Sequence, residues 1–388
     1  MQFIDLATQQ KRIRKKLEKN IMAVLDHGKY IMGPEVVEIE QRLAEYVGVK
    51  HAIGCSSGTD ALLMALMAYN VGPGDAIFTA PFTFIATAEV ISLLGATPIF
   101  VDIDPETFNI SPQELEKAIA ALKKDDPSIY PLPATKVGTL KPKGIIPVDL
   151  FGLPADYDSI NAIAKQHGLF VIEDAAQSFG AEYKNKKACS LADIACTSFF
   201  PAKPLGCYGD GGMCFTDDDM LAGLMNSVKI HGQGADKYNN VRVGINGRLD
   251  AFQAAVLNAK FDIFPEETSL RENAAQQYNQ LIEQSGCELV SPKTPSGYRS
   301  VWAQYSILAR DENHRSELQD KLKNDGIPSA IYYPKPLHVQ TAFERLAYAV
   351  DDFLVSTDFS RRIFSLPMHA YLNESDQEKI VLTLAKRI

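Results

Sequence analysis

The sequence predicts an α/β fold with a mostly parallel central sheet between helices, followed by a smaller α+β domain. Between about residues 49 and 215, short apolar runs alternate with longer amphipathic segments, as in βα units. Beyond residue 215, longer helical stretches and then mixed strands and helices replace this alternation. We therefore expect a large domain over residues 1–255, with an N-terminal helical arm, and a small domain over 256–388.

The elements of the large domain are predicted from local patterns. A capping box marks one helix start, because Ser111 precedes Pro112 at the first helical position and Glu114 follows three residues after the serine. The proline-rich stretch 123–143 lacks apolar periodicity and predicts a surface loop. The predicted strands are His51–Cys55, Ala76–Ala80, Pro98–Val101, Gly144–Leu150 and Leu169–Glu173, and the intervening helices are Ala61–Tyr69, Thr83–Leu94 and Tyr157–His167.

The second half of the chain predicts mainly helices. The stretch from Pro265 to Gln284 is long enough to bridge two domains, and Asn373 caps the last helix. The predicted helices are Asp218–Val228, Leu249–Lys260, Pro265–Gln284, His314–Asn324 and Glu374–Lys386, and the strands are Trp302–Leu308 and Ile327–Tyr332.

Composition argues against several classes of function. The net charge is −9, and no long basic stripe occurs, so we expect no nucleic-acid partner. The six cysteines form no C-x-x-C pair and do not cluster with histidine, so we expect reduced thiols and no metal site. No apolar run has the length of a membrane span, and the expected compartment is the cytoplasm.

Lys203 is the first candidate for chemistry. It stands between an apolar, strand-like run and a glycine-rich turn, within the segment TSFFPAKPLGCYGDGG. Apolar surroundings favour the neutral amine, which can form a Schiff base with an aldehyde. Most lysines are solvated surface charges, so the assignment depends on the motifs found elsewhere in the chain.

Two further motifs follow predicted strands, where ligands bind in open α/β sheets. Ser57, Gly58 and Thr59 open a helix, whose free N–H groups and positive dipole end suit a phosphate group. Asp174 ends another strand and would pair with a protonated ring nitrogen. Taken singly, each motif is also typical of an ordinary helix cap.

Three other residues complete a coherent set. Gln177 would touch a ring hydroxyl, Ser198 would add a hydroxyl to the phosphate site, and Phe84 would stack on a flat ring. Together with Lys203, these are the parts that pyridoxal 5′-phosphate requires. No G-x-G-x-x-G or Walker motif competes with this interpretation, which argues against a nicotinamide-dependent oxidoreductase.

The chain resembles the nucleotide-sugar aminotransferases of the DegT/DnrJ/EryC1/StrS family. The motifs that carry the resemblance are SGTDAL at 57–62, VIEDAAQS at 171–178 and SFFPAK at 198–203, and the similarity extends from Tyr30 to about His369. The resemblance implies a fold-type I, aspartate-aminotransferase-like enzyme that uses pyridoxal 5′-phosphate and forms a homodimer with shared active sites. The lysine at 203 also distinguishes it from the dehydratases of this family, which have histidine there.

The resemblance assigns roles to individual residues. Lys203 would be the catalytic residue that holds the cofactor covalently, and Asp174 would pair with the ring nitrogen. Asn246 would reach the phosphate from the other subunit. The remaining residues assigned to the cofactor are Ser57, Gly58, Thr59, Phe84, Gln177 and Ser198.

Within the family, the chain is most similar to enzymes that aminate C3 of UDP-2-acetamido-2-deoxy-3-oxo-glucuronic acid for bacterial surface polysaccharides such as O-antigen. By this similarity Arg248 would bind the uronate carboxylate, for which a guanidinium fork is well suited. Tyr332 and Tyr333 stand where relatives often have His-Tyr, and we expect them and His338 near the substrate. L-Glutamate is the expected amino donor.

Two alternatives remain open at this point. The first is an aminotransferase that acts at C4 or C3 of a keto-6-deoxy sugar linked to UDP or dTDP, with the same cofactor site and a different sugar pocket. The second is a non-catalytic sensor that keeps the fold. A sensor predicts a degraded lysine or phosphate motif, and the sequence contains both motifs intact.

Overall fold

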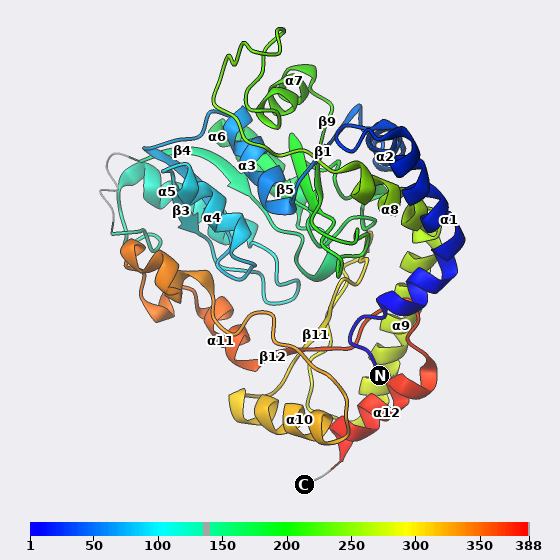
Figure 1. Ribbon diagram of the computed structural model, residues 1–388. Coiled ribbons are helices and arrows are strands. Elements are labelled where there is room, and N and C mark those ends of the chain that lie inside the picture. Colours follow the sequence, from blue (N-terminus) through cyan, green and yellow to red (C-terminus); the bar gives the residue numbers. More distant parts are fainter. Residues whose placement is uncertain (135–139, 387–388) are drawn as a thin grey trace.

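A seven-stranded sheet forms the centre of the computed structural model, which describes residues 1–134 and 140–386 (Figure 1). In the strand order β1-β9-β8-β5-β4-β2-β3, β9 runs antiparallel to both neighbours and the other pairs are parallel. Six strands therefore end at the same edge. The bounds are β1 His51–Cys55, β2 Asp75–Thr79, β3 Thr97–Phe100, β4 Lys141–Ile146, β5 Phe170–Asp174, β8 Ile194–Ser198 and β9 Gly212–Thr216.

Helices cover both faces of the sheet, because side chains alternate between faces along each strand. In β5, Val171 packs into one apolar core and Ile172 into the core on the opposite face; Ile145 and Ile146 of β4 divide in the same way. Helices α3 (Gly58–Ala68), α4 (Ala86–Leu93) and α7 (Asp219–Val228) cover one face. Helices α5 (Pro112–Lys124), α6 (Tyr157–His167), α2 (Pro34–Val47) and α8 (Ala251–Phe261) cover the other. The mostly parallel sheet between helices is confirmed.

A separate apolar core lies in the second half of the chain, below the large sheet in Figure 1. The C-terminal half of α9 (Phe264–Ser285) packs there against α10 (Glu312–Asn324), α12 (Glu374–Ala385) and the pair β11 (Tyr305–Leu308) and β12 (Ile363–Leu366). Helix α11 (Leu354–Arg362) packs instead against the core of the large sheet. A small sheet joins β6 Glu182–Tyr183, β7 Lys186–Lys187 and β10 Tyr298–Arg299, and short 3-10 helices cover 150–152, 337–339, 341–346 and 350–352.

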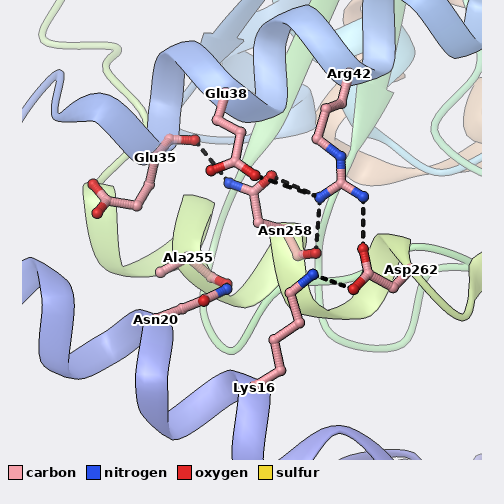
Figure 2. A network of polar contacts seen from close by, with 8 residues as sticks. All are labelled: Lys16, Asn20, Glu35, Glu38, Arg42, Ala255, Asn258 and Asp262. Atoms are coloured by element: carbon pink, nitrogen blue, oxygen red, sulfur yellow. Dashed lines mark hydrogen bonds and ion pairs between the residues drawn. The ribbon is translucent and has the colours of Figure 1, made fainter.

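The N-terminal helix α1 (Leu6–His27) is fastened to the large sheet through α8 and α2 (Figure 2). Arg42 of α2 donates from Nη1 to the backbone oxygen of Asn258 at 3.0 Å and to its Oδ1 at 3.1 Å. The Nη2 atom of Arg42 pairs with Asp262 at 2.7 Å, and Lys16 of α1 pairs with the same carboxylate. Asn258 is buried and donates to the backbone oxygen of Glu35 at 3.0 Å, so one side chain links two helices.

Some elements differ from the prediction. The helix expected from Thr83 begins at Ala86, and the residues from Thr83 to Ile85 precede it without being part of the helix. The strand expected over Ile327–Tyr332 is reduced to one bridge between Ala330 and Ser365. The small domain expected from residue 256 stays a prediction, and a division there would cut through α8. Part of the loop expected over 123–143 lies outside the described residues.

Within the described residues, the structure contains free cysteines, and it shows neither a cluster of metal-binding side chains nor a helix that could span a membrane. All six cysteines are unpaired, and five of them are buried while Cys287 is half-buried. The described residues contain no group of histidine, cysteine and carboxylate side chains suited to a metal ion. Within residues 1–134 and 140–386, no helix has both the length and the apolar character that crossing a membrane requires.

Candidate active site

A cavity of about 640 Å³ opens at the edge where the parallel strands end. It is built from the ends of β5 and β8, the first turn of α3, the segment before α4, and the loop around residues 331–333. The predicted site residues that line it are Ser57, Gly58, Thr59, Phe84, Asp174, Gln177, Ser198, Lys203, Tyr332 and Tyr333. The structure thus gathers these side chains around one space, and their roles stay predictions.

Lys203 lies in a tight turn that follows β8. Its backbone N–H donates to the oxygen of Phe200 at 2.9 Å, and the N–H of Cys207 donates to the oxygen of Phe199 at 2.7 Å. A Cβ on Gly206 would lie 2.6 Å from the Phe200 oxygen, so the turn requires glycine there. Burial lowers the pKa of Lys203 to about 8, and the charge of Asp174 acts in the opposite direction.

Asp174 is the last residue of β5 and is buried. Its Oδ2 accepts a hydrogen bond from Thr87 Oγ1 at 2.7 Å, and its Oδ1 accepts one from the N–H of Ala176 at 3.2 Å. Burial raises the pKa of Asp174, while these two bonds and the charge of Lys203 lower it. The carboxylate is therefore held in place by neutral donors and retains acceptor capacity toward the cavity.

The first turn of α3 forms a backbone cradle. Ser57 caps the helix, since its Oγ accepts from the N–H of Asp60 at 3.0 Å and also bonds the Asp60 carboxylate. The serine hydroxyl is thus occupied by capping, which leaves the backbone N–H groups of the first turn for an anion. Gly58 packs so closely on β8 that a Cβ there would lie 2.6 Å from Cβ of Ser198.

Aromatic side chains border the cavity on the side of α4. Phe84 is 54% exposed, and its ring lies 6.4 Å from the ring of Tyr333. Tyr333 packs edge-on against Phe82 with ring centres 6.3 Å apart, and its hydroxyl accepts a bond from Gln177 Nε2 at 3.2 Å. Burial raises the pKa of Tyr333, so this hydroxyl stays protonated. An apolar face and one phenol are therefore presented to the cavity.

Gln177 makes two contacts that its predicted role does not include. Its Oε1 accepts from the N–H of Phe151 at 2.7 Å, while its Nε2 donates to Tyr333. The amide thus joins the loop after β4 to the loop that carries the tyrosines. A contact with a ring hydroxyl remains a prediction for this side chain.

Three predicted residues lie away from this cavity. Asn246 is exposed, and Arg248 donates to its Oδ1 at 2.5 Å. His338 is buried, with Nε2 3.2 Å from the backbone oxygen of Val350 and its ring packed edge-on against Phe353. Burial lowers the pKa of His338. The structure shows this histidine in a core position of its own chain, and its expected contact with the substrate stays a prediction.

The sequence interpretation missed two groups next to the site. One is Thr87, whose hydroxyl bonds Asp174; the i, i+4 spacing of Thr83 and Thr87 in an apolar segment was the available signal. The other is the buried pair of Asp149 and Glu173, and burial raises the pKa of both carboxyl groups. Glu173 accepts from two backbone N–H groups and precedes Asp174 in an otherwise apolar strand, which was a visible signal.

Comparisons with known proteins agree with this geometry. Residues 11–385 match the model of the DegT/DnrJ/EryC1/StrS aminotransferase family. The chain is 47% identical, over 99% of both sequences, to the UDP-2-acetamido-2-deoxy-3-oxo-D-glucuronate aminotransferase of Pseudomonas aeruginosa. It is 41% identical to a pleiotropic regulatory protein of Geobacillus stearothermophilus, over 99% of this chain and 97% of that one. The crystal structure of a DegT DnrJ EryC1 StrS aminotransferase from Brucella abortus superposes with a TM-score of 0.92 at 49% identity, covering 99% of this chain and 98% of that one.

Proposed function

The chain belongs to the DegT/DnrJ/EryC1/StrS family of pyridoxal 5′-phosphate-dependent sugar aminotransferases, and on this premise we propose its substrates. The amino acceptor is the 3-keto carbon of UDP-2-acetamido-2-deoxy-3-oxo-glucuronic acid, and the donor is L-glutamate. The observation that carries the choice of acceptor is the 47% identity, over 99% of the chain, to the Pseudomonas aeruginosa enzyme of that name. The product would serve the synthesis of a surface polysaccharide such as O-antigen.

The residues present fit the family's cofactor. Gly58 lets the first turn of α3 pack directly on Ser198, one of the predicted phosphate-site residues, which brings that hydroxyl-bearing residue beside the backbone cradle suited to a phosphate group. The buried Asp174 carboxylate suits a protonated ring nitrogen, and the rings of Phe84 and Tyr333 border the same cavity. Lys203 lines the cavity as an amine whose pKa is lowered to about 8. When bound, pyridoxal 5′-phosphate supplies an aldehyde that condenses with amines and a ring that accepts electrons.

The protein's own groups would then position the reactants and move protons. The ε-amine of Lys203 is partly neutral near pH 8. It would therefore accept the proton from the α-carbon of glutamate and donate it to a second carbon atom within the same site. Asp174 would hold a ring N–H⁺, with its orientation fixed by Thr87 and Ala176. The apolar ring of Phe84 and the ring of Tyr333 would exclude water from one face.

The homodimer with shared sites is part of the proposal. Asn246 and Arg248 lie outside the cavity of their own chain, although the oxygen of Gly247 between them accepts from the N–H of Ser56 at 3.2 Å. The segment is therefore anchored beside one cradle while its side chains are available to a second copy. We place the enzyme in the cytoplasm, and its six unpaired cysteines are typical of a reducing compartment.

The acceptor is tested with purified enzyme, glutamate and two nucleotide sugars, the 3-oxo-uronate and a 4-keto-6-deoxy sugar. We expect turnover of the 3-oxo-uronate, and turnover of the 4-keto-6-deoxy compound alone would reject the proposed substrate. Lys203→Ala should abolish turnover and borohydride trapping. Lys260→Met is the matched control, because burial also lowers the pKa of Lys260 to about 8 while this lysine lies outside the cavity.

A further inference from the structure

Thr87 is the one side chain that donates a hydrogen bond to the carboxylate of Asp174 within the part of the chain that the structure describes. The bond joins Thr87 Oγ1 to Asp174 Oδ2 at 2.7 Å, and both residues are buried. Asp174 lies at the end of β5, whereas Thr87 lies in the first turn of α4, 87 residues away in the chain. The contact therefore depends on the fold and not on local sequence.

The direction of the bond is fixed by the chemistry of the two groups. An ionised carboxylate only accepts, and a threonine hydroxyl has one hydrogen, so Thr87 donates it to Asp174. Thr83 Oγ1 lies 3.3 Å from Thr87 Oγ1 and must then donate to it. The two threonines form a short chain of hydroxyl groups that ends on the carboxylate, and each bond polarises the next.

The same segment also borders the cavity with Phe84, which lies between the two threonines in sequence. The segment from Thr83 to Thr87 thus presents the Phe84 ring to the cavity and donates a hydrogen bond to the Asp174 carboxylate. Lys203 is the charged group that interacts with Asp174. The charge of Asp174 also raises the pKa of three other titratable groups, which are Tyr333, Tyr157 and Cys196. Burial raises the pKa of each of these three, so they are neutral at pH 7.

We propose that Thr87 is a positioning residue that keeps Asp174 oriented and ionised for the ring nitrogen of the cofactor. The inference rests on the proposed use of pyridoxal 5′-phosphate. A donor to one carboxylate oxygen fixes the rotation of the group and stabilises its charged form. Loss of that donor therefore weakens cofactor binding, and it moves the acidic limit of binding to higher pH because Asp174 accepts a proton more readily.

The test measures the dissociation constant of pyridoxal 5′-phosphate from the absorbance of reconstituted protein between pH 5.5 and 8.5, without any substrate. Thr87→Val keeps the shape and removes the donor, and we expect affinity to fall about tenfold, the value of one hydrogen bond to a charged group. The acidic limit of binding should rise by about one pH unit. Thr87→Ser keeps the hydroxyl and should stay within about threefold of wild type.

Thr83→Val is the matched control, because it makes the same chemical change in the same segment but leaves the direct donor to Asp174 in place, so we expect a smaller loss of affinity than in Thr87→Val. Wild-type affinity in Thr87→Val, equal losses in Thr83→Val and Thr87→Val, or a loss in Thr87→Ser as large as in Thr87→Val would each overturn the inference. Should Thr87→Val fail to fold, Thr87→Ala and Thr87→Ser decide in the same way. Absence of cofactor binding in wild type would instead reject the proposed function.

Discussion

Lys203 shows how one side chain acquires a function from its surroundings. Burial lowers its pKa to about 8, whereas an unperturbed lysine titrates near pH 10.4. The backbone bonds of the turn after β8 hold the residue at the cavity, and Asp174 opposes the shift without cancelling it. The neutral amine is therefore available near physiological pH.

The pKa of Lys203 predicts the pH dependence of cofactor capture by the apoprotein. Below pH 8 most of the lysine is ammonium, so the capture rate should rise about tenfold per pH unit and level off above pH 8. Borohydride reduction after a short mixing time, followed by mass spectrometry of the Lys203 peptide, measures this rate. A midpoint near that of an ordinary lysine would contradict the assigned environment.

Some site residues could be predicted from the sequence and others could not, for a physical reason. Lys203 and Asp174 are charged residues beside apolar strands. Because burying a charge without a partner is costly, charged residues at such positions are candidates for a functional site. Thr87 is an ordinary residue in an apolar helix, and its role depends on a partner 87 residues away. The packing of the His338 ring against Phe353 likewise depends on the fold, and the sequence gives no sign of it.

The strands were predicted with uneven accuracy, since the strand expected over 144–150 is observed as Lys141–Ile146, while the connecting helix Tyr157–His167 agrees in both bounds. The strand His51–Cys55 agrees in both bounds, because apolar residues between turn signals leave little choice. The segment from Ile327 to Tyr332 has the composition of a strand, but its one β-bridge joins Ala330 to Ser365. Strand composition reports suitability for a sheet, and pairing is decided by the rest of the fold.

The contact between α2 and α8 gives a test of stability. Asn258→Ala removes a buried amide that bonds Arg42 and the backbone of Glu35, and we expect it to lower the free energy of unfolding by roughly 1–3 kcal/mol. Lys16→Ala removes an exposed ion pair with Asp262 and should cost less than about 1 kcal/mol. Urea unfolding of both variants measures the difference. Equal losses would show that the network in Figure 2 is not organised around Asn258.

Assembly of two chains is tested by mixing inactive variants. If the site around Lys203 needs Asn246 from the other subunit, a mixed dimer of Lys203→Ala and Asn246→Ala chains has one complete site. Equal mixing after dissociation should restore about a quarter of wild-type activity, because half of the dimers are mixed. Each variant alone, treated identically, is the control. If the mixture shows only the residual activity of the two separate variants, Asn246 does not contribute to the site of the other subunit.

The distribution of thiols gives the folded molecule a built-in reporter. Cys55, Cys196 and Cys214 lie in one apolar core beneath the cradle, and Cys207 lies four residues after Lys203. In the native state Cys287 is half-buried and the other five cysteines are buried, so a thiol reagent should modify Cys287 first. The slower modification of Cys55, Cys196 and Cys214, which lie in β1, β8 and β9, therefore measures the rate of local opening of the sheet, and ligands that bind in the site should slow it.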